Sequence, residues 1–214
     1  MKPILLTKTT LWCRAASEFF LALRPDAMVF AGENGDPMPE ALRETSMIVS
    51  FLSPWIVPAS ALEACAGPAV NFHPAPPEYP GIGCYNFALY DAAPLYGATC
   101  HHMSPVPDTG RLVAVRRFPM YPTDTVSLLK ERTMVHLLAL FYEIAALLAQ
   151  GAPLPECAET WTRKPYLRRE LDELGRVTPD MYPDEIRRRV AAMRFPGAPG
   201  AFLELAGVRF EAAG

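Results

Sequence analysis

The sequence lacks the short motifs on which several large enzyme classes depend. It contains no HExxH pair for a zinc protease, no serine-centred nucleophile elbow and no GxxxxGK loop that cradles phosphates. Gly81-Ile82-Gly83 begins like a dinucleotide-binding loop, but its third glycine is absent and a proline-rich turn precedes it. The sequence therefore gives no support for metalloprotease, serine hydrolase, kinase or dinucleotide-dependent chemistry.

Cysteine is sparse and irregularly placed. The five cysteines are odd in number and show no CxxC spacing, so they predict neither a disulfide framework nor a zinc site, and reduced thiols are the simplest interpretation. The adjacent His101-His102 pair is a poor metal site as well, because neighbouring side chains on a strand point to opposite faces. We expect no bound metal.

Neither a strong charge excess nor a bilayer-length apolar run is present. The formal net charge of −3 argues against nucleic acid as the main partner, which usually requires a strongly basic face. The longest apolar stretch, residues 134–149, includes His136 and Glu143 and is shorter than the roughly 20 residues that span a bilayer. The N-terminal apolar run is too short for a signal peptide. We expect a cytoplasmic protein without a membrane partner.

Half of the 214 residues are hydrophobic, enough for one large domain with or without a small appendage. Short apolar runs separated by helical or loop segments favour an α/β, Rossmann-like fold, with a mostly parallel sheet and helices on both faces. The spacing predicts a helix over 11–23, and strands over 4–8, 27–31, 47–51 and 69–72.

The second half of the chain changes character. Its pattern predicts a β-ribbon of two strands, 96–103 and 112–120, followed by a long helix over 127–150 that stops at Gly151. A second helix is predicted over 183–193, and a β-hairpin is predicted from strands at 201–205 and 208–211. We therefore divide the chain into a catalytic domain, 1–151, and a small C-terminal extension with the hairpin, 152–214. Apolar residues in that hairpin, if exposed, hint at a homodimer.

Asn71-Phe72-His73-Pro74 is the most informative motif, because it directly follows a predicted parallel strand. Ligands in such sheets bind beyond the carboxyl ends of the strands. A proline-rich turn, 75–81, follows it, and Asp108-Thr109-Gly110 lies further along. An amide, an imidazole and a carboxylate together can stabilise a tetrahedral oxyanion and move a proton during acyl transfer to an amine. Individually, each is an ordinary turn residue.

The order of these motifs, with Tyr96-Gly97-Ala98-Thr99 and Met103 between them, resembles the folate-dependent formyltransferases over about residues 47–120. Two features depart from that family. Ala75-Pro76-Pro77 replaces the usual serine and leucines, and the segment before Asn71 is shorter, as if one strand–helix unit were missing from the N-terminal half.

The resemblance implies roles for individual residues. Asn71 would donate to the formyl oxygen, His73 would donate beside it or protonate the departing folate nitrogen, and Asp108 would hold the imidazole or relay a proton. The cosubstrate would be 10-formyltetrahydrofolate, without a metal. Its binding site would include Phe51, Ser53, Trp55, Ile56, Val57, Pro105, Val106 and Thr109. The 51–57 segment can equally be a strand end that folds over the core.

The C-terminal run beginning Trp161-Thr162-Arg163-Lys164-Pro165 is similar to the tail of the sugar N-formyltransferases, which favours the amine of a nucleotide-linked amino sugar as acceptor. Its binding residues would be Tyr79, Gly81, Arg163 and Lys164. Residues 161–194 carry nine basic and six acidic side chains, which indicates a solvated helix face or a nearby diphosphate. An ornithine derivative, glycinamide ribonucleotide, or folate binding without catalysis stay open as alternatives.

Overall fold

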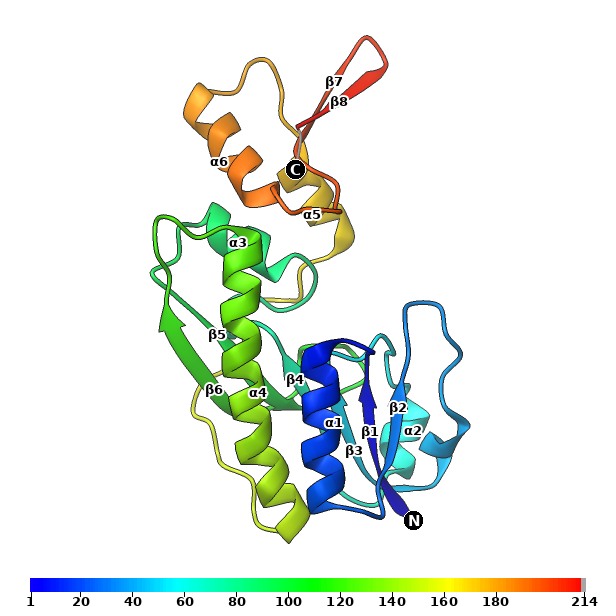
Figure 1. Ribbon diagram of the computed structural model, residues 1–214. Coiled ribbons are helices and arrows are strands. Elements are labelled where there is room, and N and C mark those ends of the chain that lie inside the picture. Colours follow the sequence, from blue (N-terminus) through cyan, green and yellow to red (C-terminus); the bar gives the residue numbers. More distant parts are fainter. Residues whose placement is uncertain (213–214) are drawn as a thin grey trace.

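The computed structural model describes residues 1–212 and is built around one sheet of six strands (Figure 1). The strand order is β2-β1-β3-β4-β5-β6; the first four strands run parallel, and β5 and β6 run antiparallel to their neighbours. The bounds are β1 Lys2–Thr7, β2 Met28–Ala31, β3 Thr45–Phe51, β4 Ala69–His73, β5 Leu95–His102 and β6 Leu112–Pro119. The predicted mostly parallel α/β sheet is confirmed.

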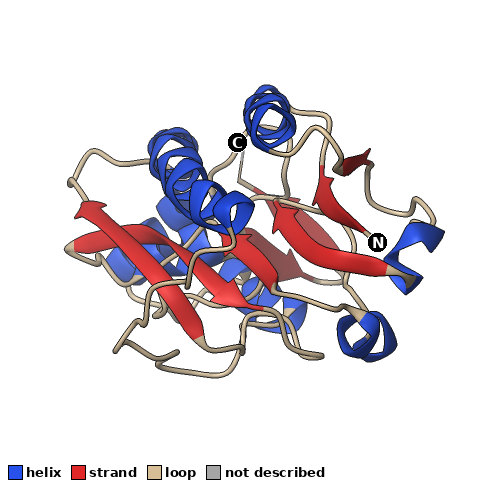
Figure 2. Ribbon diagram, turned by 90° about the horizontal axis from the view of Figure 1, so that it is seen from below, coloured by secondary structure: helices blue, strands red, loops and turns tan. Residues whose placement is uncertain are grey.

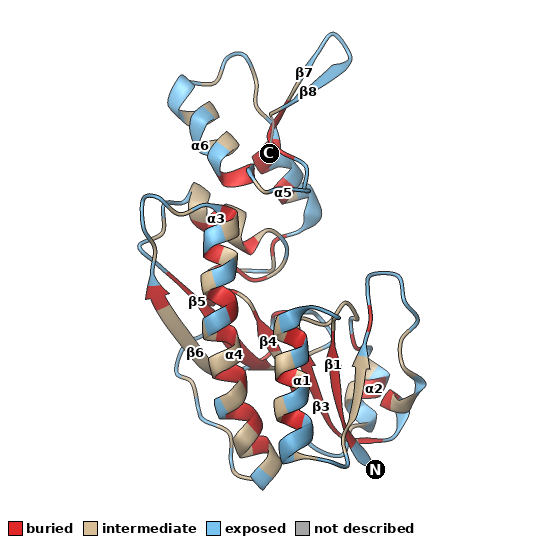
Figure 3. Cartoon of the chain, viewed as in Figure 1, coloured by how far each residue is buried: buried red, intermediate tan, exposed pale blue. Residues whose placement is uncertain are grey.

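Both faces of the sheet are buried, because alternate residues of the strands belong to two different cores. In Figure 3 the central strands are coloured mostly as buried. Leu5 belongs to the core beneath α1 (Leu11–Leu23) and α4 (Val126–Gln150), whereas its neighbours Ile4 and Leu6 belong to the opposite core. That second core includes residues from η1 (Glu40–Arg43) and α2 (Ala59–Ala64). Figure 2 shows helices on both sides of the strands, as the sequence predicts.

The segment before Asn71 is shortened, as the sequence predicts. Between β2 and β3 the chain forms only the 3-10 helix η1, whose four residues are too few for a crossover α-helix. The sequence also gave no indication of α2, α3 (Cys84–Tyr90) or α5 (Arg168–Gly175). Each is at most eight residues long, which is too short for a helical period to be read reliably.

Helix α4 ends at Gly151, as the sequence predicts, and begins at Val126, one residue before the predicted start. The Thr125 hydroxyl accepts from the Leu128 amide at 3.3 Å, and Gly151 ends the helix in a left-handed conformation with φ 65°. Within residues 1–212, α4 alone is long and apolar enough to cross a bilayer. Its buried side chains instead pack with α1 on the sheet, and core helices of this kind meet the same length test.

The C-terminal part extends beyond the end of the sheet (Figure 1). It contains α5, α6 (Pro183–Met193) and the hairpin of β7 (Phe202–Leu205) and β8 (Val208–Glu211), which turns at Ala206 and Gly207. Buried residues of α5 and α6 share one hydrophobic cluster with α3, including a close stack of Phe87 on Tyr166. A boundary after residue 151 stays a prediction. Residues 213 and 214 lie outside the described part.

Candidate active site

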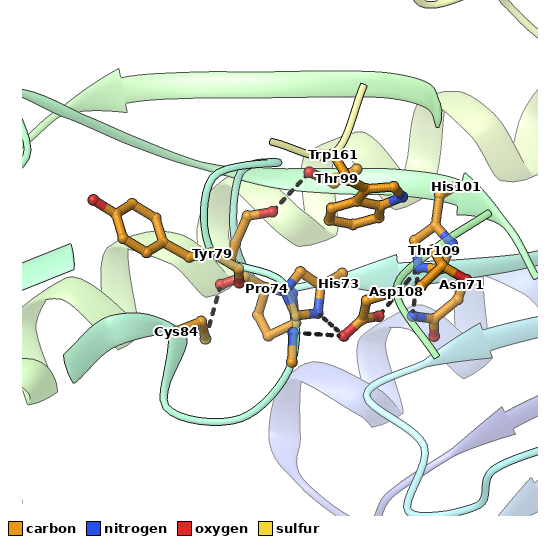
Figure 4. Close-up of polar contacts among 12 residues, drawn as sticks. Asn71, His73, Pro74, Tyr79, Cys84, Thr99, His101, Asp108, Thr109 and Trp161 are labelled. Carbon is orange, nitrogen blue, oxygen red and sulfur yellow. Dashed lines mark hydrogen bonds and ion pairs between the residues drawn. The ribbon is translucent and has the colours of Figure 1, made fainter. Parts of the chain in front are cut away.

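Strands β4 and β5 place three polar side chains on one face of the sheet. Asn71 and His73 are two residues apart and share this face, while Val70 and Phe72 point into the core beneath α4. Asn71 is paired with His101 across the antiparallel ladder, so His101 joins the same face. Figure 4 shows the three side chains converging on Asp108.

Asp108 connects the two histidines. One carboxylate oxygen, Oδ2, lies 3.3 Å from His73 Nδ1, and the other, Oδ1, lies 3.3 Å from His101 Nε2. The backbone amide of Gly81 also donates to Oδ2, at 2.9 Å. The loop between β5 and β6 therefore brings Asp108 to Asn71 and His73, although it lies far from them in the sequence.

The backbone around Asp108 follows a demanding path. Asp108 itself has φ 52°, a left-handed conformation that non-glycine residues rarely adopt. Two residues later, a Cβ on Gly110 would lie 1.7 Å from the carbonyl oxygen of His102. Only glycine fits there, so Gly110 lets the loop press against β5 and holds Asp108 over the histidines.

Both ring nitrogens of His73 are engaged. Nε2 lies 3.0 Å from the Tyr79 carbonyl oxygen, and Nδ1 faces Asp108. A carbonyl and a carboxylate can only accept hydrogen bonds, so both contacts are hydrogen bonds only when both nitrogens carry protons. The arrangement suits an imidazolium ion paired with the Asp108 carboxylate.

The charge of Asp108 is fixed by its surroundings. Burial raises the pKa of this carboxyl, but the imidazoles of His73 and His101 and the Gly81 amide outweigh that effect and hold the pKa well below its usual range. Asp108 is therefore ionised at neutral pH, even though it is only 8% exposed.

His101 is a site residue that sequence reasoning missed, because we considered His101-His102 only as a metal pair. Its Nδ1 donates to the His102 carbonyl at 2.8 Å, and its Nε2, which also faces Asp108, lies 3.1 Å from the nitrogen of the Asn71 amide. This contact holds the Asn71 amide group in place. Strand alternation puts one histidine of the pair on the Asn71 face, but the sequence does not give the register that selects His101.

A cavity of about 230 Å³ opens beside the cluster. Its lining combines the four polar residues Asn71, His73, His101 and Asp108 with the end of β3, the loop that follows it and the loop after β5. From the predicted folate site the lining includes Ser53, Trp55, Ile56 and Val57, and it adds Ser50, Leu52, Pro54, Phe72, Pro74, Met103, Ser104 and Pro107.

The other four predicted folate contacts lie away from this lining. Phe51 is fully buried and packs against Phe141, with ring centroids 5.0 Å apart, because its position on β3 faces α4. Pro105 and Val106 belong to the Asp108 loop and are exposed but do not line the cavity, and the Thr109 hydroxyl donates to the Val106 carbonyl at 2.7 Å. Thr109 therefore stabilises the loop internally.

The predicted acceptor contacts also lie outside the cavity. Tyr79 and Gly81 instead support the cluster through their backbone carbonyl and amide. Arg163 is held by Glu170 at 2.7 Å and lies over the ring of Tyr166, while Lys164 is exposed. Their roles in substrate binding stay predictions.

A second cavity, of about 300 Å³, lies where the starts of α3 and α4 meet the C-terminal part. Its lining is largely apolar but includes two cations, Lys130 from α4 and Arg168 from α5, and one carboxylate, Asp172 from α5. Lys130 lies over the ring of Phe195, at 5.0 Å from the ring centroid. Neither cation forms an ion pair with another residue of the described range, 1–212. In the same range, no three acidic, cysteine or histidine side chains are placed to hold a metal ion.

Curated relatives of this chain include the GDP-perosamine N-formyltransferases of Brucella melitensis biotype 1 and Brucella abortus. Each is 28% identical over 178 residues, which is 82% of this chain and 64% of the relative. The chain thus spans slightly less than two thirds of the length of these proteins.

Solved structures share the fold across the whole chain. A likely sugar N-formyltransferase from Mycobacterium tuberculosis superposes with a TM-score of 0.79 at 18% identity, covering 100% of this chain and 97% of that one. A sugar N-formyltransferase from a Shewanella species gives 0.81 at 15% identity over the same shares. The Helicobacter canadensis N-formyltransferase, crystallised with folinic acid and dTDP-3-aminofucose, gives 0.78 at 15% identity over 97% and 85%.

The sequence model of the formyl transferases matches residues 25–140, more than half of this chain. That range includes β3, β4 and β5 and the loop with Asp108, which are the elements that build the cluster and its cavity. The chain belongs to the formyl transferase family.

Proposed function

We propose that the protein transfers a formyl group from 10-formyltetrahydrofolate to the amine of a nucleotide-linked amino sugar. The observation that carries the proposal is the buried cluster of Asn71, His73, His101 and Asp108 on the wall of a partly apolar cavity. Oxyanion stabilisation and proton transfer are the two tasks that formyl transfer requires, and this cluster has the groups for both.

The chemistry begins when the acceptor amine attacks the formyl carbon and forms a tetrahedral oxyanion. An N–H of the Asn71 amide donates to that oxygen, and the positive charge of His73 lies beside it. As the bond from the formyl carbon to the folate nitrogen breaks, His73 supplies a proton to that nitrogen. The proton released by the amine then restores the His73–Asp108 ion pair, so the protons balance.

The cavity suits the flat head group of the folate. Trp55 and Val57 provide apolar walls, and backbone groups at the end of β3 are available to the polar edge of the ring. The volume of about 230 Å³ suits a head group, and the rest of the cofactor would then lie outside the cavity, where Ile56 is at the rim. Ile56 is 66% exposed at this edge.

The acceptor belongs to the nucleotide-linked amino sugars. Support comes from the GDP-perosamine named for the Brucella relatives and the dTDP-3-aminofucose bound by the Helicobacter protein. In this chain, Lys130 and Arg168 give the second cavity two cations for a diphosphate, against the single carboxylate of Asp172, so its charged side chains sum to +1. Arg163 and Lys164 are weaker candidates, because Arg163 already pairs with Glu170.

We also propose that the enzyme is cytoplasmic and forms a homodimer. All five cysteines are free, which suits a reducing compartment. The hairpin exposes more than half of the surface of Leu205, Val208 and Phe210. Apolar side chains gathered on a projecting hairpin are typical of a contact surface between protomers.

The function is tested by giving purified protein 10-formyltetrahydrofolate and a panel of amines, and measuring tetrahydrofolate release with mass analysis of the acceptor. The panel contains nucleotide amino sugars, an ornithine derivative and glycinamide ribonucleotide. We expect a gain of one formyl group on a nucleotide amino sugar, abolished by His73→Asn and by Asp108→Asn. Full activity in both variants would refute the mechanism, and folate binding without turnover of any amine would favour a non-catalytic protein.

A further inference from the structure

Trp161, in the segment that follows α4, packs against the cluster of Asn71, His73, His101 and Asp108. Its ring lies against both histidines, with centroids 5.9 Å from His73 and 5.2 Å from His101, at interplanar angles of 74° and 81° (Figure 4). It does not belong to the lining of the cavity beside the cluster. Trp161 therefore packs on the two histidines from outside that lining.

The indole group also holds the loop that carries Asp108. Its Nε1–H donates to the Gly110 carbonyl at 2.8 Å. Gly110 is the residue at which the loop passes too close to His102 for any side chain. One tryptophan thus contacts the two imidazoles and fixes the backbone two residues after the carboxylate that joins them.

Trp161 belongs to a segment, residues 159–166, that we call the strap. The strap runs along the turn after His73: the Thr162 amide donates to the Pro77 carbonyl at 3.2 Å, and the Tyr166 amide donates to the Pro80 carbonyl at 2.9 Å. This turn supplies the carbonyl that His73 Nε2 contacts and the Gly81 amide that donates to Asp108. The strap therefore supports both ends of the His73–Asp108 pair.

Ion pairs at the beginning of the strap add to this hold. Arg117 on β6 pairs with Glu78 of the turn at 3.0 Å and also with Glu159 of the strap. One guanidinium thus connects the outermost antiparallel strand, the turn and the strap. The turn is bound along its length by a segment that comes from beyond the long helix α4.

We propose that Trp161 is a positioning residue for formyl transfer. Its ring keeps water from one side of the two imidazoles, and its N–H holds the Asp108 loop, so the cluster keeps a single arrangement. Displacement of catalytic groups by about 1 Å can cost roughly 100-fold in rate. Loss of the ring should therefore lower kcat and leave donor binding intact. The role in catalysis rests on the proposed function.

The test compares Trp161→Leu, which removes the ring and the N–H, with Trp161→Phe, which keeps a ring. Trp12→Phe on α1 is the matched control, because Trp12 packs on the core outside the cluster. We expect Trp161→Leu to lower kcat by about 10- to 100-fold and to change the donor KM by no more than about twofold. The kcat of Trp161→Phe should lie between that of Trp161→Leu and that of Trp12→Phe, which should equal the wild-type value. Melting temperatures establish that each variant is folded.

A second readout does not depend on activity. In the ligand-free protein, the ring N–H protons of His73 and His101 are followed by NMR, and we expect them to exchange with water about tenfold faster in the Trp161 variants than in the wild type or Trp12→Phe. If no amine is formylated by the wild type, the proposed function fails but this measurement still decides the positioning role. Unchanged exchange, or an unchanged kcat in folded Trp161→Leu, would overturn the inference.

Discussion

β3 and β4 are neighbouring parallel strands, but their carboxyl ends carry opposite chemistry. β3 leads from buried Phe51 into Leu52, which has the left-handed φ of 56°, and then into the mostly apolar wall of the cavity. β4 ends at His73, where every polar side-chain atom of the histidine has a partner.

Under the proposed function, this difference would assign donor binding to the end of β3 and the reaction to the end of β4. The end of β3 offers surface that a flat ligand can cover, and Ile56 stands exposed at its edge. The end of β4 offers groups already oriented by β5 and by the Asp108 loop, so little rearrangement is needed during reaction. Substitutions at the first end should change donor binding, and those at the second should change turnover.

The strongest challenge to this division is Phe51→Ala, because Phe51 lies on β3 yet faces away from the cavity. Removing this buried ring should lower the free energy of unfolding by about 3–5 kcal/mol. Denaturant unfolding measures the loss, and the donor KM, determined where the variant is folded, should stay within about twofold.

Ile56→Ala is the matched apolar truncation on the same segment. Stability should change by no more than about 0.5 kcal/mol at this exposed position, while the donor KM should rise several-fold. A large rise in KM for Phe51→Ala, or none for Ile56→Ala, would contradict the separation of core and donor surface along this segment.

At the end of β4, Asn71→Ala removes the proposed oxyanion donor. We expect kcat to fall by roughly 100- to 1,000-fold with little change in the donor KM, because the interaction forms only in the transition state. Steady-state kinetics measure both. Asn34→Ala, in the exposed loop after β2, should leave kcat close to that of the wild type. An equal fall in both variants would remove the special role of Asn71.

The smallest expected effect is the acid sensitivity of stability. The lowered pKa of Asp108 means that its ionised form stabilises the fold; this contribution is complete above the unfolded value of about 3.9 and is lost as the pH falls through the lower folded value. Between about pH 5 and pH 3, the wild type should lose roughly 2–4 °C more in Tm than Asp108→Asn. If Tm fell equally with pH in the wild type and in Asp108→Asn, the ion pairs of Asp108 would add no stability.

Much of this organisation is visible in the sequence. Apolar runs located the strands because buried parallel strands are hydrophobic throughout, and the order of Asn71, His73 and Asp108 identified the cluster. His101 was missed because strand register depends on contacts between distant segments. Phe51 was misplaced for a related reason, since a one-residue step along a strand exchanges the cavity face for the core.

The strap has a consequence for the order in which the molecule is made. Asn71, His73, His101 and Asp108 all leave the ribosome before α4, but Trp161 follows that 25-residue helix. A nascent chain that already contains Asn71, both histidines and Asp108 still lacks the tryptophan that packs on the two histidines. The site is therefore completed late in synthesis, after the long core helix has been made.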